Sequence, residues 1–294
     1  MRIVSFLPAG TEIIHMLGAG EDLVGRSHEC DFPPEVSALP VVSRPALQLD
    51  SASPEEIDRA VAERMDAGAS MYAIDEVLLE DLRPDVIVTQ NLCRVCAPSG
   101  NELSRAVRDF NVTPEILFLS PHNMREIEDN ILSVGRAIGR DHEAQSLIES
   151  NRSRIAAVSE SVANERPRRV AFLEWADPIF CGGHWVPEMI ALAGGHDPLG
   201  RPGADSVRIS WNEVEAAAPE VIIVSPCGYG LEASAELARG IPRIAGANVF
   251  AVDANAYYAR PGPRAAEGVE LLGHLFHPEH VDWPHGHRPW TRVD

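Results

Sequence analysis

The chain has 294 residues, of which 45% are hydrophobic, so it is long enough to form two lobes that each bury a core. Lysine and arginine total 25 against 44 aspartates and glutamates, which gives a net charge of −19. So acidic a chain lacks the cationic groups that bind nucleic acid or an anionic membrane surface, and no apolar run is long enough for membrane insertion.

Short β-rich segments alternate with helical segments through the first 120 residues. The predicted strands are residues 3–7, 23–25, 86–89 and 116–119, with a further extended edge at 41–42. The predicted helices are residues 13–17, 53–67, 74–82 and 101–110. Strands that alternate with helices are typical of a parallel sheet with helical crossover connections.

Residues 124–163 contain no strand-like run and carry a helical pattern instead. Apolar residues recur there at intervals of four, three and four positions, at Ile127, Ile131, Val134 and Ile138. Gly139 interrupts this pattern, which resumes from Leu147. We therefore predict two consecutive helices, or one helix broken at Gly139, that form a spine between two lobes.

The alternation returns after the spine. The predicted strands are residues 170–173, 221–225 and 249–252, and the predicted helices are 186–193, 211–218 and 265–275. Arg83-Pro84-Asp85 and Ala218-Pro219-Glu220 each lie between a predicted helix and a strand, which indicates an internal repeat. The tail carries four histidines and is expected to be an exposed, mobile terminus: His277, His280, His285 and His287.

These patterns predict an α/β fold with two Rossmann-like lobes, parallel sheets and a long helical spine. The expected domains are an N-terminal α/β lobe at 1–120, the bridging spine at 121–166 and a C-terminal α/β lobe at 167–294. In parallel α/β sheets, ligands bind beyond the carboxyl ends of the strands. We therefore expect the ligand in a cleft between the two lobes.

All five cysteines fall in loops at the predicted strand ends: Cys30, Cys93, Cys96, Cys181 and Cys227. Thiolates and imidazoles are ligands for zinc or iron, so Cys30, Cys93, Cys96 and Cys227 are candidate metal ligands. Cysteines also pack well in tight loops, and a Cys-x-x-Cys pair without a second pair is a weak signal. Both interpretations stay open.

Large aromatic side chains lie in or beside the same loops: Trp175, Trp185, Tyr229, Tyr257 and Tyr258. Aromatic residues that line a cleft suit a large, flat and partly apolar ligand. This composition favours a bulky ligand over a small ion or a sugar.

Several segments are similar to one known family: Ser5-Phe-Leu-Pro-Ala-Gly-Thr-Glu12, Cys30-Asp-Phe-Pro-Pro34, Leu82-Arg-Pro-Asp85, Ala218-Pro-Glu220 and Arg260-Pro-Gly-Pro-Arg264. Through them, nearly the whole chain resembles the class III substrate-binding proteins, which include periplasmic cobalamin binders and binders of haem and siderophores. The resemblance implies two lobes bridged by a rigid helix and a ligand held in the cleft with little hinge motion. It also implies aromatic residues around a corrin, and Tyr257 best matches one of them.

The family presents a glutamate on each lobe, seven residues before the proline of its Pro-Asp-type motif, to dock on arginines of a membrane transporter. Those positions hold Val77 and Asn212 in this chain, and Glu76 and Glu213 lie one position away. This departure argues against docking on a transporter. The first residues also show no pattern of a secretory signal, so we expect a cytoplasmic protein.

We therefore predict a cytoplasmic protein that binds cobalamin or another corrinoid, and no catalytic residue. Its expected ligand contacts are His28, Cys30, Trp175, His184, Trp185, Tyr229, Tyr257 and Arg260. Two alternatives stay open. The chain is a metal-binding protein or metal-dependent enzyme that uses the Cys/His cluster, or it is the substrate-binding component of a cobalamin, haem or siderophore importer.

Overall fold

The structure is a computed structural model, and it describes residues 1–47, 52–67, 69–91, 103, 106–108, 110 and 113–293. The chain divides into two compact units. The N-unit consists of Met1–Pro121 and Glu126–Ile148, and the C-unit consists of His122–Arg125 and Glu149–Asp294. The predicted domain limits at 120 and 166 stay a prediction.

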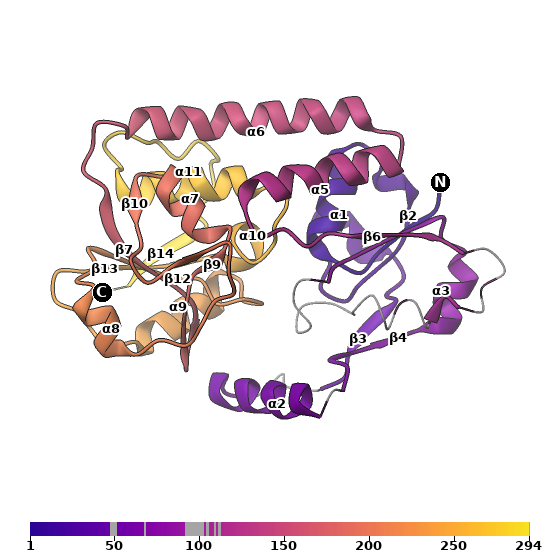
Figure 1. Ribbon diagram of the computed structural model, residues 1–294, viewed down its shortest axis with the longest axis horizontal. Coiled ribbons are helices and arrows are strands. Elements are labelled where there is room, and N and C mark those ends of the chain that lie inside the picture. The colour runs from indigo at the N-terminus through magenta and orange to yellow at the C-terminus, as the bar shows by residue number, and fades with distance from the viewer. Residues whose placement is uncertain are drawn as a thin grey trace. The chain divides into compact units, whose positions relative to one another are not determined.

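The N-unit contains a sheet of four parallel strands in the order β2-β1-β5-β6 (Figure 1). The strands are β1 (Ile3–Ser5), β2 (Leu23–Arg26), β5 (Val86–Thr89) and β6 (Glu115–Phe118). All side chains of β1 and β5 are buried, as expected for central parallel strands covered on both faces. Leu79 packs with Val4 and Ile87 on one of these faces.

The helices of this unit are α1 (Pro8–Met16), α2 (Pro54–Asp66) and α3 (Glu76–Leu82), with the short 3₁₀ helices η1 (Gly20–Asp22) and η2 (Pro34–Ala38). The predicted edge at 41–42 makes a single bridge, from Val41 to Arg26. A separate antiparallel pair forms instead between β3 (Ser43–Pro45) and β4 (Tyr72–Ile74). These strands of three residues each were not predicted, because so short a run shows no periodicity.

Two long helices follow, α5 (Met124–Ala137) and α6 (Asp141–Ser161), and each contributes residues to both units. Gly139 lies between them with a φ of 68°. Glycine adopts this left-handed conformation without the steric cost that a Cβ atom brings, so the helical pattern stops there. The prediction of two consecutive helices separated at Gly139 is confirmed.

The C-unit contains a larger sheet in the order β10-β7-β12-β13-β14, and β8 pairs with β7. Strands β10, β7, β12 and β13 are parallel, whereas β14 is antiparallel to β13. Two further short strands, β9 and β11, pair with each other. Their bounds are β7 (Arg168–Ala176), β8 (Ile179–Cys181), β9 (Gly183–His184), β10 (Gly195–His196), β11 (Arg201–Pro202), β12 (Val221–Val224), β13 (Asn248–Val252) and β14 (Trp290–Val293).

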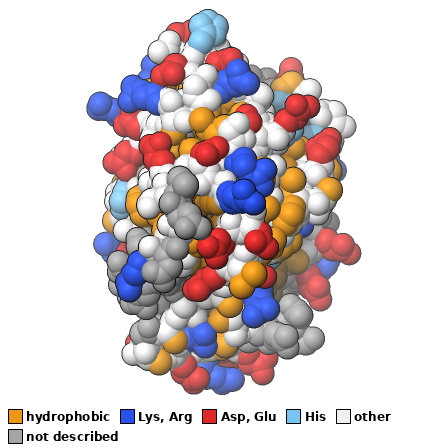
Figure 2. Space-filling view, turned by 90° about the vertical axis from the view of Figure 1, so that its right-hand side faces the viewer, with side chains coloured by type: hydrophobic (Ala, Val, Ile, Leu, Met, Phe, Trp, Pro, Cys, Tyr) orange, Lys and Arg blue, Asp and Glu red, His pale blue; other side chains and the backbone are white. Residues whose placement is uncertain are grey.

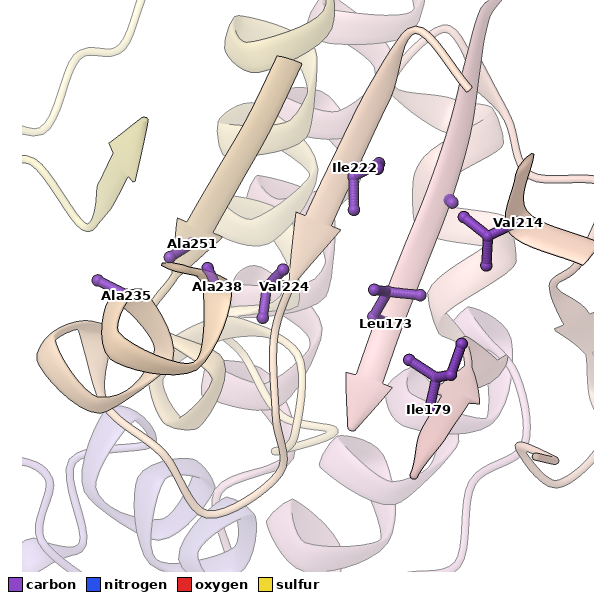
Figure 3. Close-up of a cluster of buried hydrophobic side chains, with 9 residues drawn as sticks. Leu173, Ile179, Val214, Ile222, Val224, Ala235, Ala238 and Ala251 are labelled. Atoms are coloured by element: carbon purple, nitrogen blue, oxygen red, sulfur yellow. The ribbon is translucent and has the colours of Figure 1, made fainter. Parts of the chain in front are cut away.

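Helices cover both faces of this sheet (Figure 1). They are α7 (Val186–Leu192), α8 (Trp211–Ala216), α9 (Leu231–Gly240), α10 (Ala254–Tyr257) and α11 (Ala265–Phe276). Side chains of β7, β12 and β13 meet α8 and α9 in the buried cluster of Figure 3, where Leu173, Ile222 and Val224 pack near Val214 and Ala238. This core fixes the strand ends from which the candidate site is built.

The histidine-rich tail is ordered, and the prediction of a mobile terminus was wrong. Strand β14 pairs with β13, His277 is buried, and His285 contacts the carboxylate of Glu270. Trp283 and Trp290 pack edge to face, with ring centroids 5.7 Å apart. Two tryptophans bury enough apolar surface to hold a short tail on the folded unit.

The predicted α/β class with parallel sheets is confirmed. Across the described ranges, no helix has both the length and the apolar character that crossing a membrane requires. Acidic, basic and hydrophobic side chains are interspersed over the coloured part of the face in Figure 2. The excess of acids therefore does not form one continuous patch on that part of the face.

Candidate functional site

Two predicted aromatic residues meet beyond the carboxyl ends of strands in the C-unit. Trp175 near the end of β7 and Tyr229 in the loop after β12 pack edge to face, with ring centroids 5.4 Å apart. The indole Nε1 of Trp175 donates to the carbonyl oxygen of Asp177 at 2.9 Å, which fixes the ring. Both side chains are only half-buried, and burial raises the pKa of Tyr229. The pair therefore offers an apolar surface to a flat ligand.

His184 is the polar candidate in the same unit. Its Nε2 lies 3.1 Å from Oδ1 of Asp205, and its ring centroid lies 5.9 Å from that of His122. Burial lowers the pKa of His184, although Asp205 opposes this effect. The lowered pKa favours the neutral imidazole, and the carboxylate at Nε2 favours the tautomer whose proton is on that nitrogen.

The backbone around His184 depends on Gly183. A Cβ atom at Gly183 would lie 2.5 Å from the Ser206 nitrogen and 2.8 Å from the Ala204 oxygen, so only glycine admits this close approach. The His184 nitrogen donates to the Ala204 oxygen at 2.8 Å. Residues 204–206 are thereby held against β9, with Asp205 beside the imidazole.

Three other predicted contacts lie inside the C-unit. Trp185 is 7% exposed and its Nε1 donates to the Tyr258 oxygen at 3.1 Å. Tyr257 is 2% exposed, with its hydroxyl 3.0 Å from Nε2 of His287, and Arg260 is 7% exposed. These side chains present little surface in this unit, and their role as ligand contacts stays a prediction.

The remaining two predicted contacts, His28 and Cys30, belong to the N-unit. Nδ1 of His28 lies 3.1 Å from the Ser43 hydroxyl, and its Nε2 lies 3.2 Å from the Glu29 carboxylate. Cys30 is buried, and its sulfur accepts a hydrogen bond from the Thr11 hydroxyl at 3.0 Å. Such a thiol packs as a small hydrophobic group.

The described residues do not support the predicted Cys/His metal cluster. Among them, no group of three or more histidine, cysteine, aspartate or glutamate side chains is arranged to hold a metal ion. Cys227 is exposed, and burial raises the pKa of the Cys181 thiol. Cys93 and Cys96 lie outside the described residues, so the zinc or iron site stays a prediction.

Four polar residues of the C-unit were not predicted as site residues: His122, Glu174, Asp205 and Ser225. The buried hydroxyl of Ser225, just after β12, has no hydrogen-bond partner within the described part of the chain. The sequence does offer a signal for Ser225 as a site residue, because it directly follows the apolar run Val-Ile-Ile-Val of a predicted strand. No local signal marks Asp205, because its contact with His184 joins segments 21 residues apart.

Known proteins resemble this chain over most of its length. A vitamin B12-binding protein of Vibrio cholerae is 25% identical over 280 residues, which cover 92% of this chain and 87% of the relative. The vitamin B12-binding protein of Vibrio vulnificus is 21% identical, over 92% of this chain and 88% of the relative.

Solved structures share the fold. The apo periplasmic haem-binding protein from Roseiflexus sp. RS-1 has a TM-score of 0.70 and 23% identity, and the match covers 94% of this chain and 98% of that protein. The periplasmic vitamin B12-binding protein of Vibrio cholerae has a TM-score of 0.59 and 21% identity, over 94% and 96% of the two chains.

The prediction of a cytoplasmic protein was wrong, because the matched family and both of these solved structures are periplasmic binding proteins. That prediction depended on the pattern of the first few residues, which form the buried strand β1 and contribute to the core of the N-unit. The family likeness extends instead through the folded chain, over residues 3–246. With more than half of its length matched, the chain belongs to the periplasmic binding protein family.

Proposed function

We propose that this protein is the substrate-binding component of an importer and that its ligand is a tetrapyrrole, with a corrinoid as the first candidate. The observation that carries the proposal is the Trp175–Tyr229 pair at the strand ends of the C-unit. A tetrapyrrole is large, flat and apolar on its faces, which matches a half-exposed edge-to-face aromatic pair. The vitamin B12-binding relatives support the corrinoid.

A second observation concerns the polar contact. A neutral imidazole with its Nε2 turned toward Asp205 keeps Nδ1 as an unprotonated nitrogen. Such a nitrogen suits the polar groups or the central metal of a tetrapyrrole. Haem is therefore the second candidate ligand, and the fold shared with haem-binding proteins is compatible with it.

An importer role must also account for the two docking positions at which this chain lacks the family's glutamates. Val77 and Asn212 are both exposed, in the first turns of α3 and α8. Val77 places an apolar side chain at a position where the family has a charged one. Glu213 accepts hydrogen bonds from the Ser210 nitrogen and hydroxyl, both at 2.7 Å, and so is engaged in capping α8. Contact with a transporter would therefore use other groups at these helices than the family's glutamates.

The test is a pair of UV–visible titrations of the purified protein, one with aquocobalamin and one with hemin. Saturable binding with a shifted absorption spectrum for one of them supports the proposal and identifies the ligand. Trp175→Ala is expected to weaken that binding about tenfold, which corresponds to about 1.4 kcal/mol.

Trp211→Ala is the matched control, because Trp211 is a half-buried tryptophan packed against the core cluster. It is expected to lower the thermal stability while it leaves the affinity unchanged. No spectral change with either compound at tens of micromolar, which is a binding free energy of about −6 kcal/mol or weaker, would reject the proposed function.

A further inference from the structure

Glu174 connects the two segments that carry His184 and Asp205. Its Oε1 accepts a hydrogen bond from the Gly183 nitrogen at 2.7 Å, and the Ser206 hydroxyl donates to the same carboxyl group. Gly183 directly precedes His184, and Ser206 directly follows Asp205. One side chain of β7 therefore holds both neighbours of the His184–Asp205 pair.

The Asp205 side chain itself is poorly fixed. Its side chain is 85% exposed, so burial does not hold its carboxylate beside the imidazole. The distance of 3.1 Å between His184 Nε2 and Asp205 Oδ1 depends on the backbone positions of residues 183–184 and 204–206. A change at a group that holds this backbone should therefore change the contact.

The Glu174 carboxyl is enclosed by this backbone. Burial raises its pKa, and the hydrogen bonds from Gly183 and Ser206 oppose that effect. A half-buried carboxyl group that makes two hydrogen bonds to separate segments connects them, since leaving either donor unpaired costs free energy. We propose that Glu174 is a positioning residue, which keeps His184 Nε2 against Asp205 and so leaves Nδ1 for the ligand.

The part of this proposal that concerns the ligand depends on the proposed function, whereas the part that concerns the imidazole does not. The first measurement is therefore made without ligand. Long-range ¹H–¹⁵N spectra of the histidine rings at about pH 8, where neutral rings predominate, report the tautomer of His184. The signals are assigned with His184→Gln.

Wild type is expected to show the tautomer protonated at Nε2. Glu174→Gln should keep it, because the amide oxygen still accepts from Gly183. Glu174→Leu should shift the ring toward a mixture of tautomers, and its affinity for the compound that binds wild type should fall about tenfold or more. Ser206→Ala removes one of the two hydrogen bonds and should show a smaller change in the same direction.

Asp197→Asn is the matched control. Asp197 is also a half-buried carboxyl group beside β7, and it accepts from the nitrogens of Phe172, Leu199 and Gly200 at 3.1, 2.9 and 3.2 Å. None of these three nitrogens belongs to residues 183–184 or 204–206. The charge of Asp197 raises the pKa of Glu174, so its removal favours the ionised carboxylate that accepts the two hydrogen bonds. Asp197→Asn should therefore lower the melting temperature without changing the His184 signals.

An unchanged His184 tautomer in Glu174→Leu would overturn the proposal. If that variant does not fold, unchanged signals in Ser206→Ala would overturn it in the same way. If the tautomer changes as expected but wild type binds neither aquocobalamin nor hemin, the positioning role stands and the proposed function fails.

Discussion

Arg83 and Ala218 occupy the same position in the two units. Each has left-handed backbone, with φ of 44° and 46°, and each directly precedes a proline that leads into a central strand. The helix before each of them begins at an equivalent N-cap, nine residues ahead of the proline. Asp75 accepts from the Leu78 nitrogen, and Ser210 accepts from the Glu213 nitrogen. The internal repeat predicted from Arg-Pro-Asp and Ala-Pro-Glu is therefore a repeat of cap, helix, turn and strand.

The left-handed turn at Ala218 predicts a stabilising substitution. A Cβ atom in this conformation costs roughly 1–2 kcal/mol, and glycine avoids that cost while it loses some chain entropy. Ala218 is exposed, so its methyl group contributes little packing. Ala218→Gly should therefore raise the free energy of unfolding by about 0.5–1 kcal/mol, as measured by urea denaturation.

Ala216 provides the control for this substitution. It is the exposed last residue of α8, two positions earlier, where the backbone is helical. Ala216→Gly should lower the free energy of unfolding by about 0.5–1 kcal/mol. Equal destabilisation by both glycines would show that Ala218 carries no strain.

Glu220 is the acidic residue of the Ala-Pro-Glu turn before β12, and it predicts a dependence of stability on pH. Hydrogen bonds from the Arg166 guanidinium and from the Arg169 nitrogen hold the pKa of Glu220 at about 2. Because this folded-state pKa lies below the unfolded value, the contribution to stability is complete above the unfolded pKa and is lost as the pH falls toward 2. The free energy of unfolding of Glu220→Gln should therefore lie below that of wild type at pH 6 and approach it in acid.

This convergence is measured by urea denaturation at a series of pH values, in low and in high salt. The guanidinium of Arg166 is exposed, so the difference between the two proteins should shrink in high salt. A difference that stays constant down to pH 2 would mean that Glu220 has the same pKa in the folded and the unfolded protein.

The ion pair between Arg154 of α6 and Glu270 of α11 predicts a large loss of stability when it is broken. The guanidinium donates to both carboxylate oxygens, at 2.8 and 2.6 Å, and Nε2 of His285 lies 2.7 Å from Oε2. Burial alone would raise the pKa of Glu270, but the hydrogen bonds from Arg154 and His285 keep it below its usual value. Arg154→Met leaves a buried carboxylate without its main partner and should cost about 3 kcal/mol.

The double variant Arg154→Met, Glu270→Met separates the pair from its surroundings. Removal of both charges should cost less than the sum of the two single substitutions, because no uncompensated charge stays buried. Additive losses in the free energy of unfolding would show that the two groups do not interact.

The sequence predicted the parts of the fold that depend on local patterns. Val86–Thr89 and Val221–Val224 are continuous apolar runs, as buried parallel strands require, and both form central strands. Strands β9 and β11 have two residues each, too few to show a period, and they form through the pairing of Gly183 with Arg201 and of His184 with Pro202. Tertiary contact, not local preference, determines such elements.

The residues of the candidate site likewise fall into those that local sequence patterns predicted and those that depend on tertiary contacts. Trp175, Tyr229 and His184 were predicted because large or polar side chains at strand ends are visible in the sequence. Glu174 and Asp205 were missed as site residues, because each matters through a partner 9 or 21 positions away. Such pairings follow from the path of the chain, which the sequence pattern does not reveal.

Cys227 provides a chemical probe of the candidate site. Its thiol is exposed in the loop that follows β12, two residues before Tyr229, whereas Cys30 and Cys181 are buried. In a Cys93→Ser, Cys96→Ser background, Cys227 should therefore react with a maleimide about tenfold or more faster than the other two thiols. Mass spectrometry of peptides identifies which thiol is modified.

A ligand that covers Trp175 and Tyr229 should also shield this neighbouring thiol. The backbone nitrogen of Cys227 donates to the backbone carbonyl oxygen of Glu174 at 3.1 Å. This bond holds the loop beside β7 and next to Trp175. Saturation with the compound that binds in the titrations should slow the modification of Cys227. Cys227→Ser should leave the affinity for that compound unchanged, because the thiol lies beside the aromatic pair and is not part of it. Full reactivity of Cys227 in the saturated protein would place the ligand away from this loop, and the aromatic pair would then not be its binding surface.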